Sequence, residues 1–350
     1  MKIDLYRWFC LSCFALYCGF AQSPATAPPS SANRRITLDV VVTDKSGKPV
    51  PGLEQSDFTL LDNKQPNKLV SFEAVESGAS AADPPVEVTL LVDEVNTSFR
   101  GVASARQQIE KFLRRDGGKL ERPLSLVFLS DSGIKSTSTS RDGNALADEM
   151  NQNPAGLRII GRIQGIYGAG DRIQLSLRAL ELFADYESTR PGRKLVIWIS
   201  PGWPLLSGPR VELSGKEQQG LFKTIVALSD AMRQSRITLY SIDPLGLSDS
   251  RGLRALRYQN YVKGVKRASQ VSIGNLALQV LAEQSGGRAI QYDNDIGSEI
   301  VTSIADTSAY YVVSFDGLPG DGPNEYHAIE VKLDKSGLKA RTRAGYYAQP

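Results

Sequence analysis

The pattern of apolar and polar positions changes twice along the chain. Between residues 36 and 43 apolar side chains occupy every second position, which is typical of a half-buried strand, and similar short runs continue to about residue 75. Three more alternating runs end the chain, at 308–317, 326–334 and 338–348. Strands so few and so short bury too little surface to be stable alone. We therefore expect one small β-sandwich built from both chain ends, 35–80 and 307–350.

Between these ends, from about 86 to 306, strand-like and helix-like patterns alternate. Residues 86–93 form a nearly continuous apolar run, as expected of a central parallel strand that is covered on both faces. Further strands are predicted at 124–131, 134–139, 194–200, 237–243 and 288–294, and helices at 101–115, 171–187, 217–234, 275–286 and 296–306. This alternation predicts an α/β fold: a doubly wound, mostly parallel, Rossmann-like sheet at 85–306, inserted into the sandwich. A binding crevice is expected at the carboxyl ends of its strands.

The N-terminal segment 1–21 is typical of a secretory signal peptide, because Lys2 and Arg7 precede an apolar run that ends at small residues around Ala21. The apolar run is shorter than the roughly 20 residues that span a bilayer, so no membrane span is expected in the mature chain. Residues 22–34 are rich in Pro, Ser and Ala and predict a flexible linker. A secreted or periplasmic protein is therefore expected.

Composition and motifs argue against several classes of function. All three cysteines lie in the predicted signal peptide, so the mature chain would contain no disulfide and no thiol nucleophile. The 41 basic and 38 acidic residues nearly balance, which gives no indication of nucleic-acid binding. His327 is the one histidine, and the chain contains no Gly-x-Ser-x-Gly, His-Glu-x-x-His or phosphate-loop motif. The sequence therefore favours a protein that is not an enzyme.

The stretch LLVDEVNTSFRG (90–101) runs from an apolar strand into Asp93, then into the polar residues Asn96, Thr97 and Ser98, just before a predicted helix. Two interpretations stay open. Oxygen-bearing side chains at the end of a central strand are suitable ligands for a divalent cation such as Mg²⁺ or Mn²⁺. Alternatively, the same short polar side chains cap the helix that begins near Ser98, a role worth roughly 0.5–2 kcal/mol that needs no ion.

An apolar strand ending in Asp, followed by hydroxyl side chains and repeated strand–helix units, resembles the von Willebrand factor type A domain. The end segments VVVTDKSGKPVPGLEQSDFTLLDN and KARTRAGYYA, together with PGRKLVIWISPG, are similar to those of the secreted bacterial "VWFA-related" proteins. The resemblance covers about 36–350. It implies a protein-binding, adhesion-type module, in which a divalent ion at the crevice takes a carboxylate from the ligand.

The resemblance also implies which residues would hold that ion. In the family the first strand ends in Asp-x-Ser-x-Ser, a Thr comes from a later loop, and an Asp-Gly follows the fourth strand. Asp93 matches the first Asp and Thr97 the second Ser, whereas Val95 and Pro201 stand where the family has Ser and Asp. The segment IYGAGDRIQ, expected to be the loop, has no Thr but contains Asp171. The site is therefore interpreted as degenerate, with Asp93, Thr97 and Asp171 as its metal ligands.

Two loops are predicted to contact a partner, together with Asn96 and Ser98 beside the crevice. Trp203 follows the fourth strand and is expected at the crevice rim, or else packed beneath its own proline-containing loop. The connection 244–274 is long and basic, with aromatic residues interleaved, and it favours an acidic partner; the alternative is a solvated cover over the sheet edge. Its predicted contacts are Arg254, Tyr258 and Tyr261.

Together these patterns predict a secreted, non-enzymatic module that binds a protein ligand at the crevice through a degenerate metal-ion-dependent adhesion site. A structural cell-envelope domain without ion dependence is the second interpretation, and a hydrolase is the third. A pocket in which a nucleophile and a base converge would identify the hydrolase.

Overall fold

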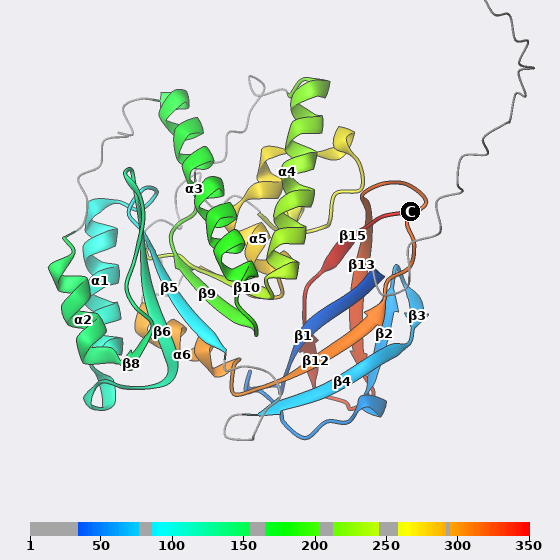
Figure 1. Ribbon diagram of the computed structural model, residues 1–350, viewed down its shortest axis with the longest axis horizontal. Helices are drawn as coiled ribbons and strands as arrows, with labels where there is room; N and C mark the ends of the chain where they lie inside the picture. Colours follow the sequence, from blue (N-terminus) through cyan, green and yellow to red (C-terminus); the bar gives the residue numbers. More distant parts are fainter. Residues whose placement is uncertain (1–33, 77–85, 155–164, 204–212, 245–257, 292–294) are drawn as a thin grey trace, which may run out of the picture.

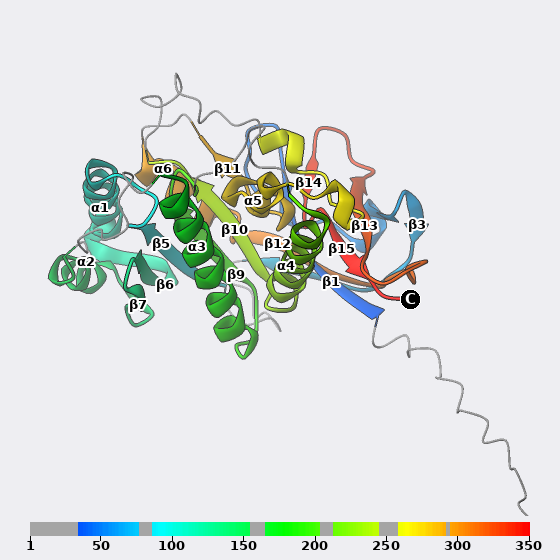
Figure 2. The same cartoon turned by 90° about the horizontal axis from the view of Figure 1, so that it is seen from above.

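The computed structural model describes residues 34–76, 86–154, 165–203, 213–244, 258–291 and 295–350. A central sheet flanked by helices lies beside two four-stranded antiparallel sheets (Figure 1). The view turned by 90° also shows the two parts side by side (Figure 2). The predicted α/β class with an accompanying β-sandwich is therefore confirmed. The predicted signal peptide and nearly all of the predicted linker, residues 1–33, lie outside the described residues.

The central sheet has the strand order β11-β10-β9-β5-β6-β7, and β8 also pairs with β6. Its parallel strands are β5 (Glu87–Asp93), β6 (Lys119–Ser130), β9 (Lys194–Ile199), β10 (Ile237–Ile242) and β11 (Ala289–Ile290). The short strands β7 (Gly133–Ser136) and β8 (Ser140–Asp142) pair antiparallel with β6. The order of the strands reverses between β5 and β9, and in doubly wound sheets the crevice outside the carboxyl ends at this reversal is where ligands bind.

Helices cover both faces of this sheet because its strands are apolar on both sides. The first face is covered by α1 (Phe99–Leu113), α2 (Gly143–Gln152) and α6 (Ile296–Ala305), and the second by α3 (Gly165–Ser188), α4 (Gly215–Gln234) and α5 (Leu278–Gln284). Successive strand residues alternate between the two cores: Leu90 and Val92 pack with α1, and Leu91 packs with α3. The continuous apolar run in β5 is thereby explained.

The sandwich combines strands from both chain ends in each of its sheets. One sheet has the order β14-β1-β12-β4 and the other β15-β13-β2-β3. Their bounds are β1 Arg35–Thr43, β2 Phe58–Asp62, β3 Gln65–Asn67, β4 Leu69–Glu76, β12 Ala309–Asp316, β13 Glu325–Leu333, β14 Lys339–Arg341 and β15 Gly345–Ala348. The N-terminal β1 pairs with the C-terminal β12, and β2 pairs with β13, so neither end forms a sheet by itself.

The alternation in β1 has the predicted meaning. Ile36, Leu38, Val40 and Val42 all belong to the sandwich core. Val41 points the other way and belongs to the core of the central domain. The sheet that contains β1 therefore packs on the sandwich core with one face and against the central domain with the other.

Some elements differ from those predicted. The sequence analysis did not identify α2 and β8, and α3 begins at Gly165 rather than near 171. The segment 166–174, in which the resemblance implied the ligand-bearing loop, is helical throughout. Glycine in a helix costs about 0.5–1 kcal/mol relative to alanine. The burial of Ala169 and the packing of Ile173 against the core offset this cost.

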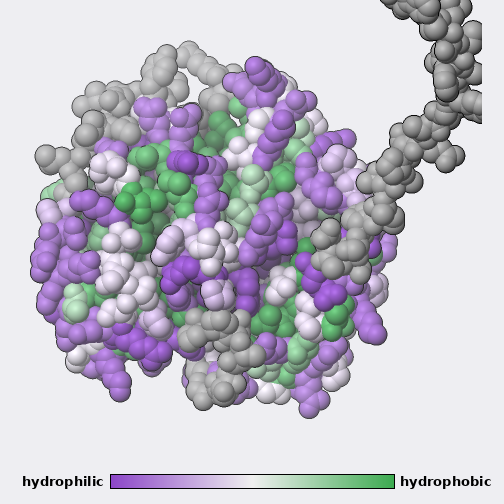
Figure 3. All heavy atoms as spheres, viewed as in Figure 1, coloured by the Kyte–Doolittle hydropathy of each residue, from purple (hydrophilic) through white to green (hydrophobic). Residues whose placement is uncertain are grey.

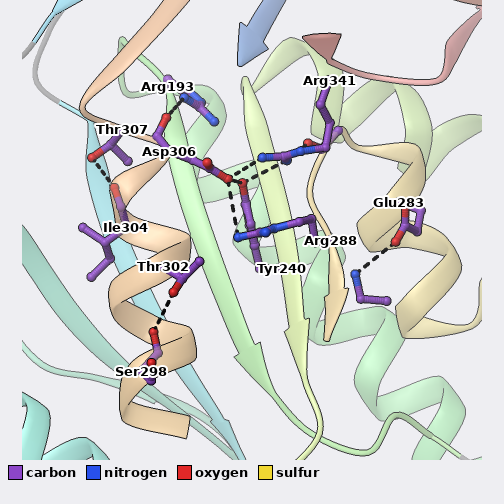
Figure 4. A network of polar contacts seen from close by, with 12 residues as sticks. Arg193, Tyr240, Glu283, Arg288, Ser298, Thr302, Ile304, Asp306, Thr307 and Arg341 are labelled. Atoms are coloured by element: carbon purple, nitrogen blue, oxygen red, sulfur yellow. Dashed lines mark hydrogen bonds and ion pairs between the residues drawn. The ribbon is translucent and has the colours of Figure 1, made fainter. Parts of the chain in front are cut away.

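A buried polar network joins the central domain to the sandwich (Figure 4). Asp306, the C-cap of α6, is 2% exposed, and its carboxylate accepts hydrogen bonds from the Tyr240 hydroxyl and the Arg341 guanidinium. Burial raises the pKa of Tyr240 to about 12, so its hydroxyl keeps its proton and donates. Arg193 donates to the Asp306 carbonyl at 3.1 Å, and Arg288 lies 3.9 Å from the carboxylate. The network thus includes side chains from both parts of the molecule.

Close backbone contact reinforces this junction. Gly286 has φ +89°, and a Cβ atom there would lie 2.7 Å from the carbonyl carbon of Thr342. The Thr342 hydroxyl donates to the Asp39 carbonyl at 2.9 Å, and the Asp39 carboxylate pairs with Arg236 at 2.5 Å. The C-terminal segment is therefore held between β1 and the central domain, which gives a structural role to the sequence KARTRAGYYA.

We predict that Asp306→Ala lowers the free energy of unfolding by about 3–5 kcal/mol, because it leaves the guanidinium of Arg341 buried without its carboxylate. Urea unfolding measures this loss. Asp316→Ala is the control, because the pair of Asp316 with Arg35 is 36–40% exposed and is worth about 1 kcal/mol or less. Equal losses in the two variants would contradict a special role for the Asp306 network.

Candidate functional site

Asp93 is the last residue of β5 and lies where the strand order reverses, beside the end of β9. Its side chain folds back over the turn that follows: Oδ1 accepts from the backbone amides of Val95, at 3.0 Å, and Asn96, at 2.8 Å. A short acidic side chain commonly stabilises a turn in this way. These two bonds fix the turn that connects β5 to α1.

The second oxygen of Asp93 is also fully engaged. Oδ2 accepts from the Asn96 amide at 2.8 Å, the Trp198 indole at 3.2 Å and the Ser200 hydroxyl at 2.7 Å. An ionised carboxylate has about four lone-pair positions. Five N–H and O–H groups therefore saturate it. Asp93 is also 0% exposed.

The predicted metal-ligand role of Asp93 does not fit this geometry. A divalent cation needs a carboxylate lone pair that points at the ion. Here the five hydrogen-bond donors already use the lone pairs of Asp93. The side chain is buried, contrary to the expectation that it faces solvent in the crevice. Ser200 and Trp198 of the β9 end donate to the carboxylate, so the space expected for an ion is filled by protein donors.

Asn96 connects the turn to α3 rather than to solvent. It is 2% exposed, and its amide nitrogen donates both to Asp93 and, at 2.8 Å, to the hydroxyl of Ser176. Ser176 in turn donates to the Arg172 carbonyl at 2.8 Å. The carbonyl oxygen of Asn96 has no hydrogen-bond partner within the described part of the chain. A single neutral oxygen does not form a cation site. Because Asn96 is buried, it also does not have the predicted role of contacting a partner.

Asp171 is the predicted ligand that the structure separates from the others. It is exposed on α3, whereas Ser176 on the same helix is fully buried against Asn96. The two positions are five apart, so they point in different directions on a helix. The prediction failed because it placed 166–174 in a loop. Ser176 is the residue that was missed; its signal is a small polar residue among Ile173, Leu177 and Leu180.

Ser98 has the capping role that the alternative interpretation gave it. Its backbone is extended, and its hydroxyl accepts from the Gly101 amide at 3.2 Å, at the start of α1. Thr97 is 1% exposed. Asp93 therefore stabilises the turn after β5 and Ser98 caps α1, while Thr97 is buried and not presented to solvent as the predicted ion site requires.

Trp203 is buried, not a rim contact. It is 4% exposed, its indole donates to the Leu276 carbonyl at 2.9 Å, and its ring packs edge-on against Trp198 at 5.8 Å between centroids. Gly202, with φ +82°, turns the chain back so that this happens. Gln279 closes the same turn by donating to the Pro201 carbonyl at 3.1 Å. Trp203 therefore packs in the interior and not at the rim; the loop 204–212, which the alternative interpretation placed over it, lies outside the described residues.

The basic connection after β10 is partly described. Arg254 lies outside the described residues. Tyr258 and Tyr261 bound the 3₁₀ helix η6 (Tyr258–Tyr261) and are both half-buried. The Tyr261 ring covers Gly274, where a Cβ atom would lie 2.7 Å from it. One part of the Tyr261 side chain thus packs against Gly274, and the remainder is exposed.

An exposed aromatic residue that was not predicted from the sequence lies beside the site. Phe99, the first residue of α1, is 80% exposed. It lies at a groove of about 310 Å³ between α1 and Asn151 of α2, with Arg106 and Glu110 on its walls. Its signal was an apolar residue outside the buried α1 stripe formed by Val102, Ala105 and Ile109.

His327, the one histidine in the chain, is 3% exposed in the sandwich. Its Nδ1 lies 2.9 Å from Asp62 and 3.2 Å from the Tyr346 hydroxyl, which donates to Asp62 at 2.7 Å. The amide of Leu318 also donates to Asp62, at 3.1 Å. This cluster satisfies a buried carboxylate between the two chain ends.

No helix in the described part of the chain is both long and apolar enough to cross a bilayer. No group of three or more His, Cys, Asp or Glu residues in that part is arranged to hold a metal ion.

Comparisons with known proteins give similarity at the level of fold. No family model and no curated protein matches the chain. Structural matches include an aerotolerance-related membrane protein from Bacteroides fragilis (13% identity, 63% of this chain and 98% of that chain, TM-score 0.35). They also include the pilus adhesin SpaC from Lactobacillus rhamnosus GG (10%, 86% and 43%, 0.39) and the von Willebrand A domain of SpRpn10 (15%, 62% and 94%, 0.28).

The doubly wound sheet that the von Willebrand A resemblance implied agrees with the strand order of this chain. The chain spans less than half of the matched SpaC chain. With TM-scores below 0.5, these likenesses carry no argument about what this chain binds or does. The doubly wound architecture is established by the strand order of this chain itself.

We predict that Asp93→Asn lowers the free energy of unfolding by about 3 kcal/mol or more. The substitution removes the charge that five donors share and places an amide N–H among them. Chemical denaturation followed by tryptophan fluorescence measures the loss. Asp171→Asn, at an exposed position, should change stability by no more than about 0.5 kcal/mol. A change below 1 kcal/mol in Asp93→Asn would contradict the role given to this carboxylate.

We predict no saturable heat when Mg²⁺ or Mn²⁺ is titrated into the protein in a calorimeter, because no lone pair of Asp93 points to an open position. Thermal unfolding should likewise be unchanged by these ions. Asp171→Asn is a folded control for the second predicted ligand. Saturable binding to the wild-type chain that this variant abolishes would restore the ion site.

Proposed function

We propose that this chain is an exported, non-enzymatic protein-recognition module that binds its partner without a metal ion, on the α1 surface next to the Asp93 turn. The observation that carries the proposal is Phe99, an aromatic side chain 80% exposed beside a groove of about 310 Å³. Aromatic residues are enriched among the energetically dominant contacts of protein interfaces. Exposure of this extent has no packing role in the free chain.

The surface around Phe99 suits a protein ligand. On the face seen in Figure 3, apolar residues gather in patches that polar residues separate. The groove has an apolar part, Val102 and Ala103, and a polar part, Arg106 and Glu110. An interface with an apolar centre and a polar rim has this composition.

The groove rests on a rigid base. Arg106 donates to the carbonyls of Met150, at 2.5 Å, and Asn153, and pairs with Glu94 at 3.3 Å, so it ties α1 to α2 and to the turn after β5. Asp93 holds that turn from the other side. Little conformational entropy would be lost on binding, because the residues that carry Phe99 are already fixed.

An acidic partner remains part of the proposal because of the basic connection. Lys263, Lys266 and Arg267 are exposed, whereas Val265 between them is buried. The Tyr347 hydroxyl donates to the Val265 carbonyl at 3.2 Å, which fixes this segment on the sandwich. Cations on an anchored backbone would attract an acidic protein over a distance that depends on salt.

The absence of enzymatic activity is supported by the surroundings of His327, which is buried against Asp62 and Tyr346 and so is not available to activate a nucleophile. Export is supported by the charged and apolar pattern of residues 1–21. A structural envelope domain is the competing function. It would need neither an exposed Phe99 nor an adjoining groove.

A photo-crosslinking amino acid at position 99 or 103 tests the proposal in cells that produce the protein. We expect one discrete adduct from both positions, and none from position 182, where Leu182 is 45% exposed on α3. Wild-type protein added in excess should compete for the adduct, and Phe99→Ala should compete at least about tenfold less well. For an acidic partner, adduct yield falls as salt rises. Equal adducts at all three positions would exclude recognition at this surface.

A further inference from the structure

A cavity of about 320 Å³ lies at the amino-terminal ends of the strands β5 and β6, whereas Asp93 lies at the carboxyl end of β5. It is formed by the end of α1, the following 3₁₀ helix η3 (Arg115–Gly118), the first half of β6, the beginning of β5, and α6. The cavity is therefore remote from the crevice, which lies at the carboxyl ends of the strands. It is also remote from Phe99, because it adjoins the last turn of α1 and Phe99 begins that helix. Its volume is at the lower end of the range of about 300–1,000 Å³ typical of small-molecule sites.

Its floor and one wall are apolar. Val88 of β5 and Leu124 of β6 form the floor and are 1% exposed, while Phe112 of α1 and Ile304 of α6 are partly buried on either side. Val301 stands at the mouth and is 36% exposed. Water against this apolar part of the lining makes few hydrogen bonds, so a hydrocarbon chain that displaces it there is favoured.

Charged side chains surround the remainder of the cavity, with cations in excess. Arg115, Lys119 and Arg122 face two acidic residues, Asp116 and Glu121. Both acids are exposed, whereas Arg122 is half-buried. Arg122 is thus more buried than either acidic residue of the lining. A ligand with a negative head group is complementary to its positive charge.

Arg122 is held in place by the end of α6. Its Nη2 donates to the Thr307 carbonyl at 2.8 Å, two residues beyond that helix. Burial is the main cause that lowers the pKa of Arg122, and the positive charge of Arg141 acts in the same direction. A carboxylate head group at this end of the cavity would be attracted by the positive charges of Arg122, Arg115 and Lys119.

We propose that this cavity binds an amphiphilic carboxylate, with its hydrocarbon chain between Phe112 and Ile304 and its head group beside Arg122. The site does not depend on the protein-recognition surface, because the two lie at opposite edges of the sheet. The proposed ligand class is a medium-length fatty acid. Chain length is limited by the volume of the cavity, and charge is selected by its cations.

Decanoate and decanol, titrated below the concentrations at which they form aggregates, test the head group and the chain separately. We expect saturable calorimetric binding of decanoate to the full chain and weaker binding of decanol. Arg122→Gln should weaken decanoate about tenfold and leave decanol unchanged, because it removes charge without removing apolar wall. Lys111→Gln is the control, since Lys111 is exposed on α1 outside the cavity.

Filling the cavity tests the location. Val301→Phe should abolish binding of both probes while Arg122 is intact, and Ala305→Leu serves the same purpose if the first variant does not fold. Urea unfolding confirms that each variant is folded. No saturable decanoate binding to the wild-type chain, or binding that both filling variants retain, overturns the site. Equal decanoate affinity in Arg122→Gln and wild type overturns the carboxylate selectivity.

Discussion

The site depends on the hydrogen bonds that the buried carboxylate of Asp93 accepts. It joins the end of β5 to the end of β9 through Trp198 and Ser200, and to its own turn through two backbone amides. An ionised carboxylate without water is stable only if hydrogen bonds replace its hydration. The donors that do so come from the turn after β5 and from the end of β9, where the strand order reverses, so the carboxylate closes this crevice rather than opening it.

This arrangement separates architecture from ion chemistry. The fold provides a place for a ligand at the carboxyl ends of β5 and β9, but Trp203 and Trp198 pack together under that edge and Gln279 covers the turn. On the outer side of α1, by contrast, Phe99 is exposed at the start of the helix. A packed interior and an aromatic residue exposed beside it are compatible with recognition that needs no cation.

The two parts of the molecule are constrained by one another. Each sheet of the sandwich contains strands from both chain ends, so neither end can complete a sheet without the other. The buried pair of Asp306 and Arg341, and the close approach of Gly286 to Thr342, then fix the orientation of the sandwich. Desolvated ion pairs act over short distances and in one geometry, which favours a single arrangement of the two parts.

The sequence by itself determined the fold class, because the period of the apolar positions reports directly how many faces of a strand or helix are buried. The continuous run in β5 and the alternation of Ile36 to Val42 both had the predicted meaning. It also located the polar turn at 93–98. Only the tertiary structure decided what that turn does, because the lone pairs of Asp93 are occupied by Trp198 and Ser200, residues more than a hundred positions away. The same holds for Asp171 and Trp203: whether a side chain faces solvent depends on the helix or loop packed against it, and no local pattern reports that.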